Sequence, residues 1–202
     1  MALAACGGTT AGATTAPPQS SPQQAQSASA FAGTGWEVVR VPEVALELNL
    51  PLAAGWRALS GSAWTRLDHP ASASLLEVRV LRAERRVKPE DCAARARLER
   101  PELPAFTTED AVDAQLVTAP PGFRAQQVVS AQEAPDAALV GEVSLYAAGV
   151  GRCFVAHFIT RFSGPAREQE ISHRLALVTD RIIPSLRLRD ADTRIAPEPF
   201  AK

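Results

Sequence analysis

The sequence LVGEVSLYAAGVGRCFVAHFITRF, residues 139–162, contains two predicted strands whose pairing can be read from the residues alone. It holds two runs of alternating apolar and polar residues joined at Gly149-Val150, a pair that suits a two-residue hairpin turn because glycine accepts a positive φ. Such a turn pairs Ala148 with Gly151, and the residue numbers of every further pair sum to 299. The stretch is therefore predicted to form an antiparallel hairpin.

This register gives the predicted hairpin two different faces. One face is apolar, and on it Gly141, Val143 and Leu145 are paired with Phe158, Ala156 and Phe154. The other face is mixed, and on it Glu142, Ser144 and Tyr146 are paired with His157, Val155 and Cys153. We expect the apolar face to lie against the core.

The mixed face contains residue types that serve thiol enzymes, with Cys153 as nucleophile, His157 as base and Glu142 as the residue that orients the base. The spacing disfavours this arrangement, because residues four apart on a strand are about 13 Å apart and their side chains cannot hydrogen-bond directly. A surface ion pair between Glu142 and His157 is the preferred interpretation.

Outward from the hairpin, the patterns predict further strands and three helices. The strands are expected at 37–41, 44–50, 63–67, 74–82, 123–132 and 185–189. The helices are expected at about 89–99, 108–116 and 166–183. Together they indicate an α+β fold, an antiparallel β-sheet with helices packed on it.

The helix near the C-terminus has the clearest pattern. Ile171, Leu175, Val178 and Ile182 follow the spacing of one helix face, while Arg174 falls elsewhere. We therefore expect a long amphipathic helix that packs one apolar stripe on the sheet.

Charge divides the chain into three parts. Residues 1–35 contain no Asp, Glu, Lys or Arg, and residues 7–35 are almost wholly Gly, Ala, Ser, Thr, Pro and Gln, so we expect a disordered tether. Residues 36–189 are predicted to form a single domain, followed by a polar tail at 190–202. The net charge of −1 does not favour nucleic acid as a partner.

The tether begins with Leu3-Ala4-Ala5-Cys6-Gly7, which resembles the lipobox of bacterial lipoproteins. The resemblance implies a lipid anchor on Cys6 and, with Gly7 rather than Asp after the cysteine, forwarding to the outer membrane, facing the periplasm or the cell surface. Met1 to Ala5 cannot supply the charged and apolar regions of a signal peptide, so we expect those regions upstream of Met1. The alternative is an incidental cysteine in a cytoplasmic protein.

A second resemblance concerns the domain. Leu48-Asn49-Leu50-Pro51-Leu52-Ala53-Ala54-Gly55-Trp56, followed by Trp64 and the strand at 74–82, is similar to the start of PsbP-like domains, and the helix that runs into Ile183-Pro184-Ser185-Leu186 is similar to their closing helix. The resemblance implies an antiparallel sheet covered by helices. It implies partner binding and supplies no catalytic residues.

Cys92 and Cys153 are the two cysteines of the predicted domain. In an exported protein they would form a disulfide, whereas in a cytoplasmic protein they would remain buried free thiols. We favour the disulfide, conditional on export.

The tryptophans Trp36, Trp56 and Trp64 lie close together in the sequence. They are candidates for an exposed aromatic platform that binds a sugar, a peptide or a protein partner, although such residues more often fill a core corner. A basic run between Arg82 and Arg100 is interspersed with acidic residues, and we interpret it as a solvated face.

The common motifs of hydrolases, metalloproteases and nucleotide-binding enzymes do not occur in the sequence. We therefore expect no catalytic residues, no metal and no cofactor. The favoured hypothesis is a non-catalytic cell-envelope lipoprotein whose tethered domain binds or scaffolds an unidentified protein or small molecule. The alternatives are a hydrolase-type enzyme with a site built from scattered residues, and a cytoplasmic partner-binding module.

Overall fold

The computed structural model describes residues 37–41, 46–50, 55–59, 63–116, 119 and 122–188. Its center is a seven-stranded antiparallel sheet in the order β3-β4-β5-β9-β8-β7-β6. These strands are β3 (Arg57–Leu59), β4 (Thr65–His69), β5 (Ser74–Arg86), β6 (Val112–Asp113), β7 (Arg124–Glu133), β8 (Leu139–Ala148) and β9 (Val150–Phe162).

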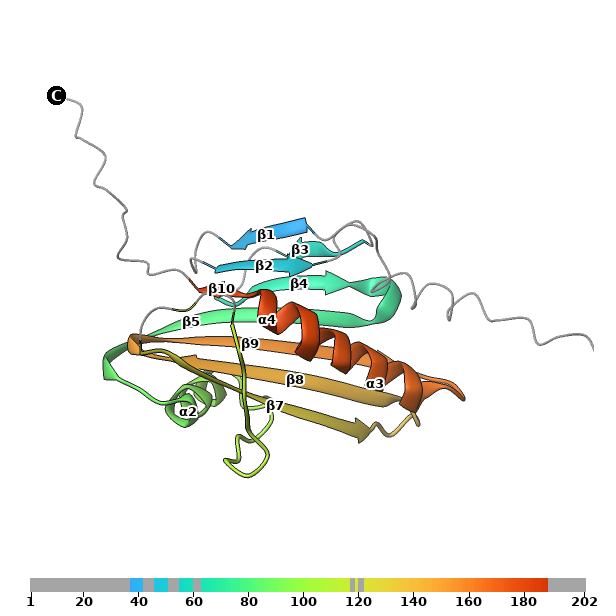
Figure 1. The fold of residues 1–202 in the computed structure, drawn as a ribbon. Coiled ribbons are helices and arrows are strands. Elements are labelled where there is room, and N and C mark those ends of the chain that lie inside the picture. Colours follow the sequence, from blue (N-terminus) through green and yellow to red (C-terminus); the bar gives the residue numbers. More distant parts are fainter. Residues whose placement is uncertain are drawn as a thin grey trace, which may run out of the picture.

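A smaller sheet and the helices complete the architecture. The smaller sheet has the order β1-β2-β10 and is antiparallel, with β1 (Glu37–Val41), β2 (Leu46–Leu50) and β10 (Arg187–Leu188). The helices are the short 3-10 turn η3 (Pro70–Ser72), α2 (Pro89–Glu99), α3 (Arg167–Leu177), its π-helical continuation η4 (Val178–Ile182) and α4 (Ile183–Ser185). The predicted α+β class is confirmed (Figure 1).

The large sheet has two covered faces, because side chains of successive strand residues point in opposite directions. Leu145 belongs to the core that packs with α3 and η4, whereas the next residue, Tyr146, belongs to the core that packs with α2. We call these sides the α3 face and the α2 face. Figure 1 shows α3 lying along the sheet, with α2 near the end where β8 turns into β9.

Most of the α3 face is apolar. The four residues predicted to line one side of the C-terminal helix, Ile171, Leu175, Val178 and Ile182, are all buried. Gly141 on β8 allows the helix to approach closely, since a Cβ there would lie 2.6 Å from Cγ2 of Ile171.

The central hairpin forms with a register that differs from the predicted one. Ala148 pairs with Cys153, so the residue numbers of each pair sum to 301 rather than 299. The reason is a longer turn: Gly149 donates its N–H to the carbonyl of Arg152 at 3.2 Å, and the positive φ of +79° occurs at Gly151. A shift of two keeps every side chain on its predicted face.

One predicted helix is wrong. The segment 108–116 contains a turn followed by β6, where Val112 and Asp113 pair with Gln127 and Gln126 of β7. Valine and aspartate are weak helix formers, and so short a helix needs packing to stabilise it. Among the described residues, no helix has the length and apolarity needed to cross a membrane.

Candidate functional site

A row of polar side chains runs across the middle of the α2 face. The pairings of β4 with β5, β5 with β9 and β9 with β8 place Arg66, Glu77, His157 and Ser144 side by side. Three of them are almost completely buried, with exposed fractions of 1% for Glu77, 5% for His157 and 1% for Ser144. Buried polar groups need partners, so this row is the first place to look for chemistry.

Glu77 is held by two arginines. Its Oε1 forms ion pairs with Nε of Arg66 and Nη1 of Arg100, both at 2.9 Å. The hydrogen bond to Glu77 is the largest of the influences that raise the pKa of Arg100. Both cationic partners contact the same oxygen of the buried carboxylate, so Glu77 acts as a link between β4 and the end of α2.

His157 has a hydroxyl partner. Its Nδ1 lies 2.9 Å from Oγ of Ser144, and the tautomer decides which atom donates. Burial lowers the pKa of His157 to about 4, outweighing the opposite influence of the Glu77 carboxylate. The imidazole is therefore neutral at pH 7.

The segment that follows α2 covers this row. Leu103 is buried, and the ring of Phe106 meets that of Tyr146 edge to face at 5.5 Å. Arg100 stacks over Trp64 at 5.7 Å while it binds Glu77. Because the segment packs over the row, neither the hydroxyl of Ser144 nor the imidazole is open to a substrate.

The end of α2 is fixed to β5 by a second ion pair. Glu99 accepts hydrogen bonds from Nε and Nη2 of Arg79 at 3.0 and 3.2 Å, and from Nε1 of Trp64 at 3.1 Å. The hydrogen bond from Arg79 is the main reason why the pKa of Glu99 is lowered. The polar groups of the α2 face thus fasten α2 and residues 100–106 to the sheet.

Cys92 and Cys153 form the disulfide that the sequence favoured, with a Cα–Cα distance of 5.5 Å. It joins α2 to β9, and both cysteines are fully buried. A bonded Cys153 is no nucleophile, so the disfavoured thiol-enzyme arrangement is wrong. The expected Glu142–His157 pair is also wrong: Glu142 lies opposite Ile159, and burial raises the pKa of its carboxyl.

The other predicted site residues have different positions. Trp56 and Trp64 are buried, with exposed fractions of 6% and 3%, so these two fill core corners and form no exposed platform. Trp56 packs near His69 on the α3 side, with ring centroids 5.5 Å apart, and Trp64 belongs to the α2 side. Trp36 and Cys6 lie outside the described residues.

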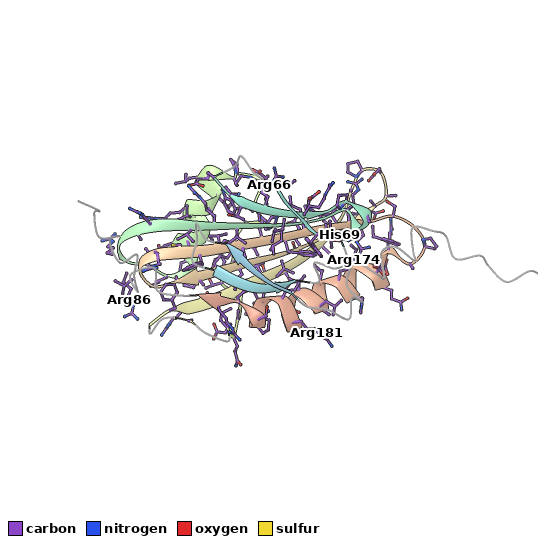
Figure 2. All side chains as sticks on the ribbon, turned by 90° about the horizontal axis from the view of Figure 1, so that it is seen from above. Arg66, His69, Arg86, Arg174 and Arg181 are labelled. Atoms are coloured by element: carbon purple, nitrogen blue, oxygen red, sulfur yellow. A yellow bond between two sulfur atoms is a disulfide. The ribbon has the colours of Figure 1, made fainter. Side chains whose placement is uncertain are left out.

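A second buried polar cluster fastens α3 to the sheet. Arg174, placed on the outer side by the sequence pattern, is fully buried, and its Nη1 donates to the carbonyl of Ser72 and to Oγ1 of Thr160, both at 2.8 Å. Its Nε donates to Glu170 at 2.8 Å. Burial is the main reason why the pKa of Arg174 is lowered. Figure 2 shows Arg174 close to His69.

A small cavity lies under the π-helical continuation η4. Its lining is apolar and includes Leu76, Val143, Phe158, Val178, Ile182 and Leu186. Its volume of about 10 Å³ is the size of a single water, too small for an organic ligand. Among the described residues, no group of three His, Cys, Asp or Glu side chains is arranged to hold a metal ion.

Sequence reasoning missed the groups that matter most on the α2 face. Glu77 occupies the polar position of an alternating strand and was therefore expected in water. The hairpin sequence contained the one signal that could have revealed the row. A four-residue turn, as the structure has, places Ser144 rather than Glu142 opposite His157.

Comparisons with known proteins find distant structural similarity only. No protein-family model and no curated protein matches this chain. A crystal structure from Bacteroides thetaiotaomicron is similar over 77% of this chain, with 12% identity and a TM-score of 0.45, and this chain spans about half (49%) of that protein. LpqN of Mycobacterium tuberculosis, described as involved in cell envelope biogenesis, is similar over 86% of this chain and all of its own length, with 14% identity and a TM-score of 0.43. The lipobox-like and PsbP-like resemblances stay predictions.

Proposed function

We propose that this chain is a non-catalytic lipoprotein of the bacterial cell envelope, in which acylated Cys6 anchors a binding or scaffolding domain to a membrane. The observation that supports it most is the Cys92–Cys153 disulfide, which closes a sequence separation of 61 residues inside one domain. Structural disulfides persist in oxidising compartments and are rare in the cytosol. The cytoplasmic alternative requires two free thiols at these positions.

The lipobox-like Leu3-Ala4-Ala5-Cys6 supplies the second support. The 29 residues between Cys6 and Trp36 contain no charge, and an extended chain of that length reaches about 100 Å. Such a tether gives a domain of this size room to turn and meet a partner near the membrane.

Labelling with an alkyne analogue of palmitate in the native host, starting from the full-length gene, tests the anchor. We expect label on the wild-type protein and none on the Cys6→Ser variant. Thr9→Ser serves as the matched control, since it changes a nearby residue but leaves both Cys6 and the Cys92–Cys153 disulfide. An unlabelled wild-type protein, or label that survives Cys6→Ser, contradicts the proposal.

One observation favours the hydrolase alternative, the 2.9 Å contact between Ser144 and His157. The burial of both residues and the arginine partners of Glu77 weigh against it. A fluorophosphonate probe, which labels activated serines, distinguishes the two. Labelling that disappears in Ser144→Ala would establish the hydrolase in place of the binding domain.

A further inference from the structure

One end of the large sheet gathers basic residues that are far apart in the sequence. Arg82 of β5 lies directly opposite Arg152 of β9, and Arg86 lies opposite Val150. At the same end, Arg124 begins β7 opposite Ala148. We call this the basic end, and it comprises Arg82, Arg85, Arg86, Lys88, Arg95, Arg124 and Arg152.

Contacts between backbone and side chains hold these residues together. Arg95 of α2 donates to the carbonyl of Arg82 at 2.6 Å. The N–H of Val87 donates to the carbonyl of Gly149 at 3.2 Å, which joins the end of β5 to the β8–β9 turn. The cluster is therefore a property of the fold, and Figure 2 shows Arg86 at the end of the sheet far from His69 and Arg174.

The charge at this end differs from that of the whole chain. Residues 82–95 with Arg124 and Arg152 contain seven cations and three carboxylates, a balance of +4 in a chain whose net charge is −1. Two of the carboxylates have local roles: Asp91 accepts the N–H of Lys88 at the start of α2, and Glu90 pairs with the Lys88 ammonium. The basic run that the sequence shows, from Arg82 to Arg100, does not include Arg124 and Arg152, which only the fold brings to this end.

Two features of the basic end are unusual for a folded domain. Like charges directly opposite on neighbouring strands, as at Arg82 and Arg152, are destabilising. Val150 at the turn is 67% exposed, although it is apolar. Positions that break local rules in this way often serve function.

We infer that the basic end is a membrane-contact surface that binds anionic phospholipid headgroups and inserts Val150 at the interface. Clustered arginines attract anionic lipids electrostatically, and an apolar side chain at the tip adds affinity for a bilayer, because it can be buried at the membrane interface. Binding to nucleic acid would gain little from such a side chain. The inference rests on the membrane location in the proposed function, and it adds an orientation: the domain lies with the β8–β9 turn toward the bilayer.

The test uses the 202-residue chain with Cys6→Ser, so that no acyl chain contributes. Binding to vesicles of phosphatidylcholine with about one-third phosphatidylglycerol is measured by sedimentation at low ionic strength. We expect binding to these vesicles, little to pure phosphatidylcholine, and loss in high salt. Absence of binding to the anionic vesicles overturns the inference, while the labelling of Cys6 stays a separate result.

A charge-matched pair of variants tests the location. Each basic residue near an anionic surface contributes about fivefold in affinity, so Arg85→Glu with Arg124→Glu should weaken binding by about 25-fold or more. The control variant combines Arg181→Glu with Arg187→Glu, which changes exposed arginines of η4 and β10 and gives the same net charge as the first variant. It should bind the vesicles as tightly as the parent protein. Equal losses in both variants would contradict a defined surface.

Two further variants complete the test. Arg85→Gln with Arg124→Gln gives a milder change, in case the reversals disturb folding. Val150→Ser should weaken vesicle binding while leaving its salt dependence unchanged.

Duplex DNA that binds the basic end more tightly than the anionic vesicles would replace the membrane with nucleic acid as the partner.

Discussion

The two faces of the large sheet are covered by different means. The α3 face is packed with apolar side chains such as Val143, Phe158 and Ile171, and its helix lies against Gly141. The α2 face holds a short helix, an irregular segment, a disulfide and the buried Glu77–His157–Ser144 row. Apart from the Arg174 cluster, shape and apolar burial stabilise the first face, whereas covalent and polar links predominate on the second.

The two faces should therefore differ in their sensitivity to solution conditions. Redox conditions and pH act on a disulfide and on titratable groups, and have little effect on apolar packing. The α2 face should therefore respond to reductant and acid before the α3 face does.

Removal of the disulfide should have the largest effect. Replacing both Cys92 and Cys153 by alanine should lower the free energy of unfolding by about 4 kcal/mol, because the bond closes a long loop. Urea titration followed by circular dichroism measures the change. A reductant should reproduce the loss in the wild-type protein and leave the alanine variant unaffected; a loss below about 1 kcal/mol would mean that packing alone holds α2.

Acid should loosen the α2 face next. The pKa of His157 is about 4 in the folded protein, below its usual 6.5, so the unfolded chain binds more protons between these pH values. The contribution of His157 to the free energy of unfolding is therefore fully present above pH 6.5. It falls by about 3 kcal/mol as the pH decreases toward 4.

The control for this pH dependence is built into the chain. His157→Gln should flatten the fall in unfolding free energy between pH 6.5 and 4, whereas exchange of the exposed His173 should not. Chemical denaturation at a series of pH values shows the difference. An unchanged slope in His157→Gln would assign the acid sensitivity to another group.

Loss of the buried carboxylate should have a somewhat smaller effect. Glu77→Gln leaves Arg66 and Arg100 without their shared counter-charge, and we expect a loss of about 2 to 3 kcal/mol, because the two arginines are partly exposed. Glu99→Gln removes a more exposed ion pair and should cost less than about 1 kcal/mol. Similar losses in the two variants would show that burial of Glu77 adds nothing.

A packing change tests the α3 face. Gly141→Ala places a methyl group within 2.6 Å of Ile171 and 3.1 Å of Leu175, and should lower the unfolding free energy by about 1 to 3 kcal/mol at every pH. The same change in an Ile171→Ala background should cost much less, because the close contact is absent. A loss that grows in acid would contradict the division between the faces.

The sequence predicted the α3 face well because its signal is periodic. Alternation in the two hairpin strands and the spacing of Ile171, Leu175, Val178 and Ile182 both reflect apolar burial. The sum of the paired residue numbers in the hairpin is 301 rather than the predicted 299. This difference did not change the predicted faces, because a shift of two keeps each residue on its face.

The α2 face was less predictable for a physical reason. Glu77, Ser144 and His157 are polar residues whose burial depends on partners far away in the sequence, and strand alternation assigns such residues to water. The covering segment at 100–106 has no periodic pattern that marks it as a cover. The disulfide was the exception. Cys92 and Cys153 are the two cysteines of the predicted domain, so the sequence offers each of them one candidate partner.

Mass spectrometry of the protein isolated from its native host is the most direct test of the central claim, that an exported domain is locked by Cys92–Cys153 and anchored through Cys6. Cells are quenched with acid, and the chain is unfolded and alkylated without reductant. We expect no alkylation at Cys92 or Cys153 and a diacylglyceryl group on Cys6. Alkylation at all three cysteines would contradict both the bond and the anchor.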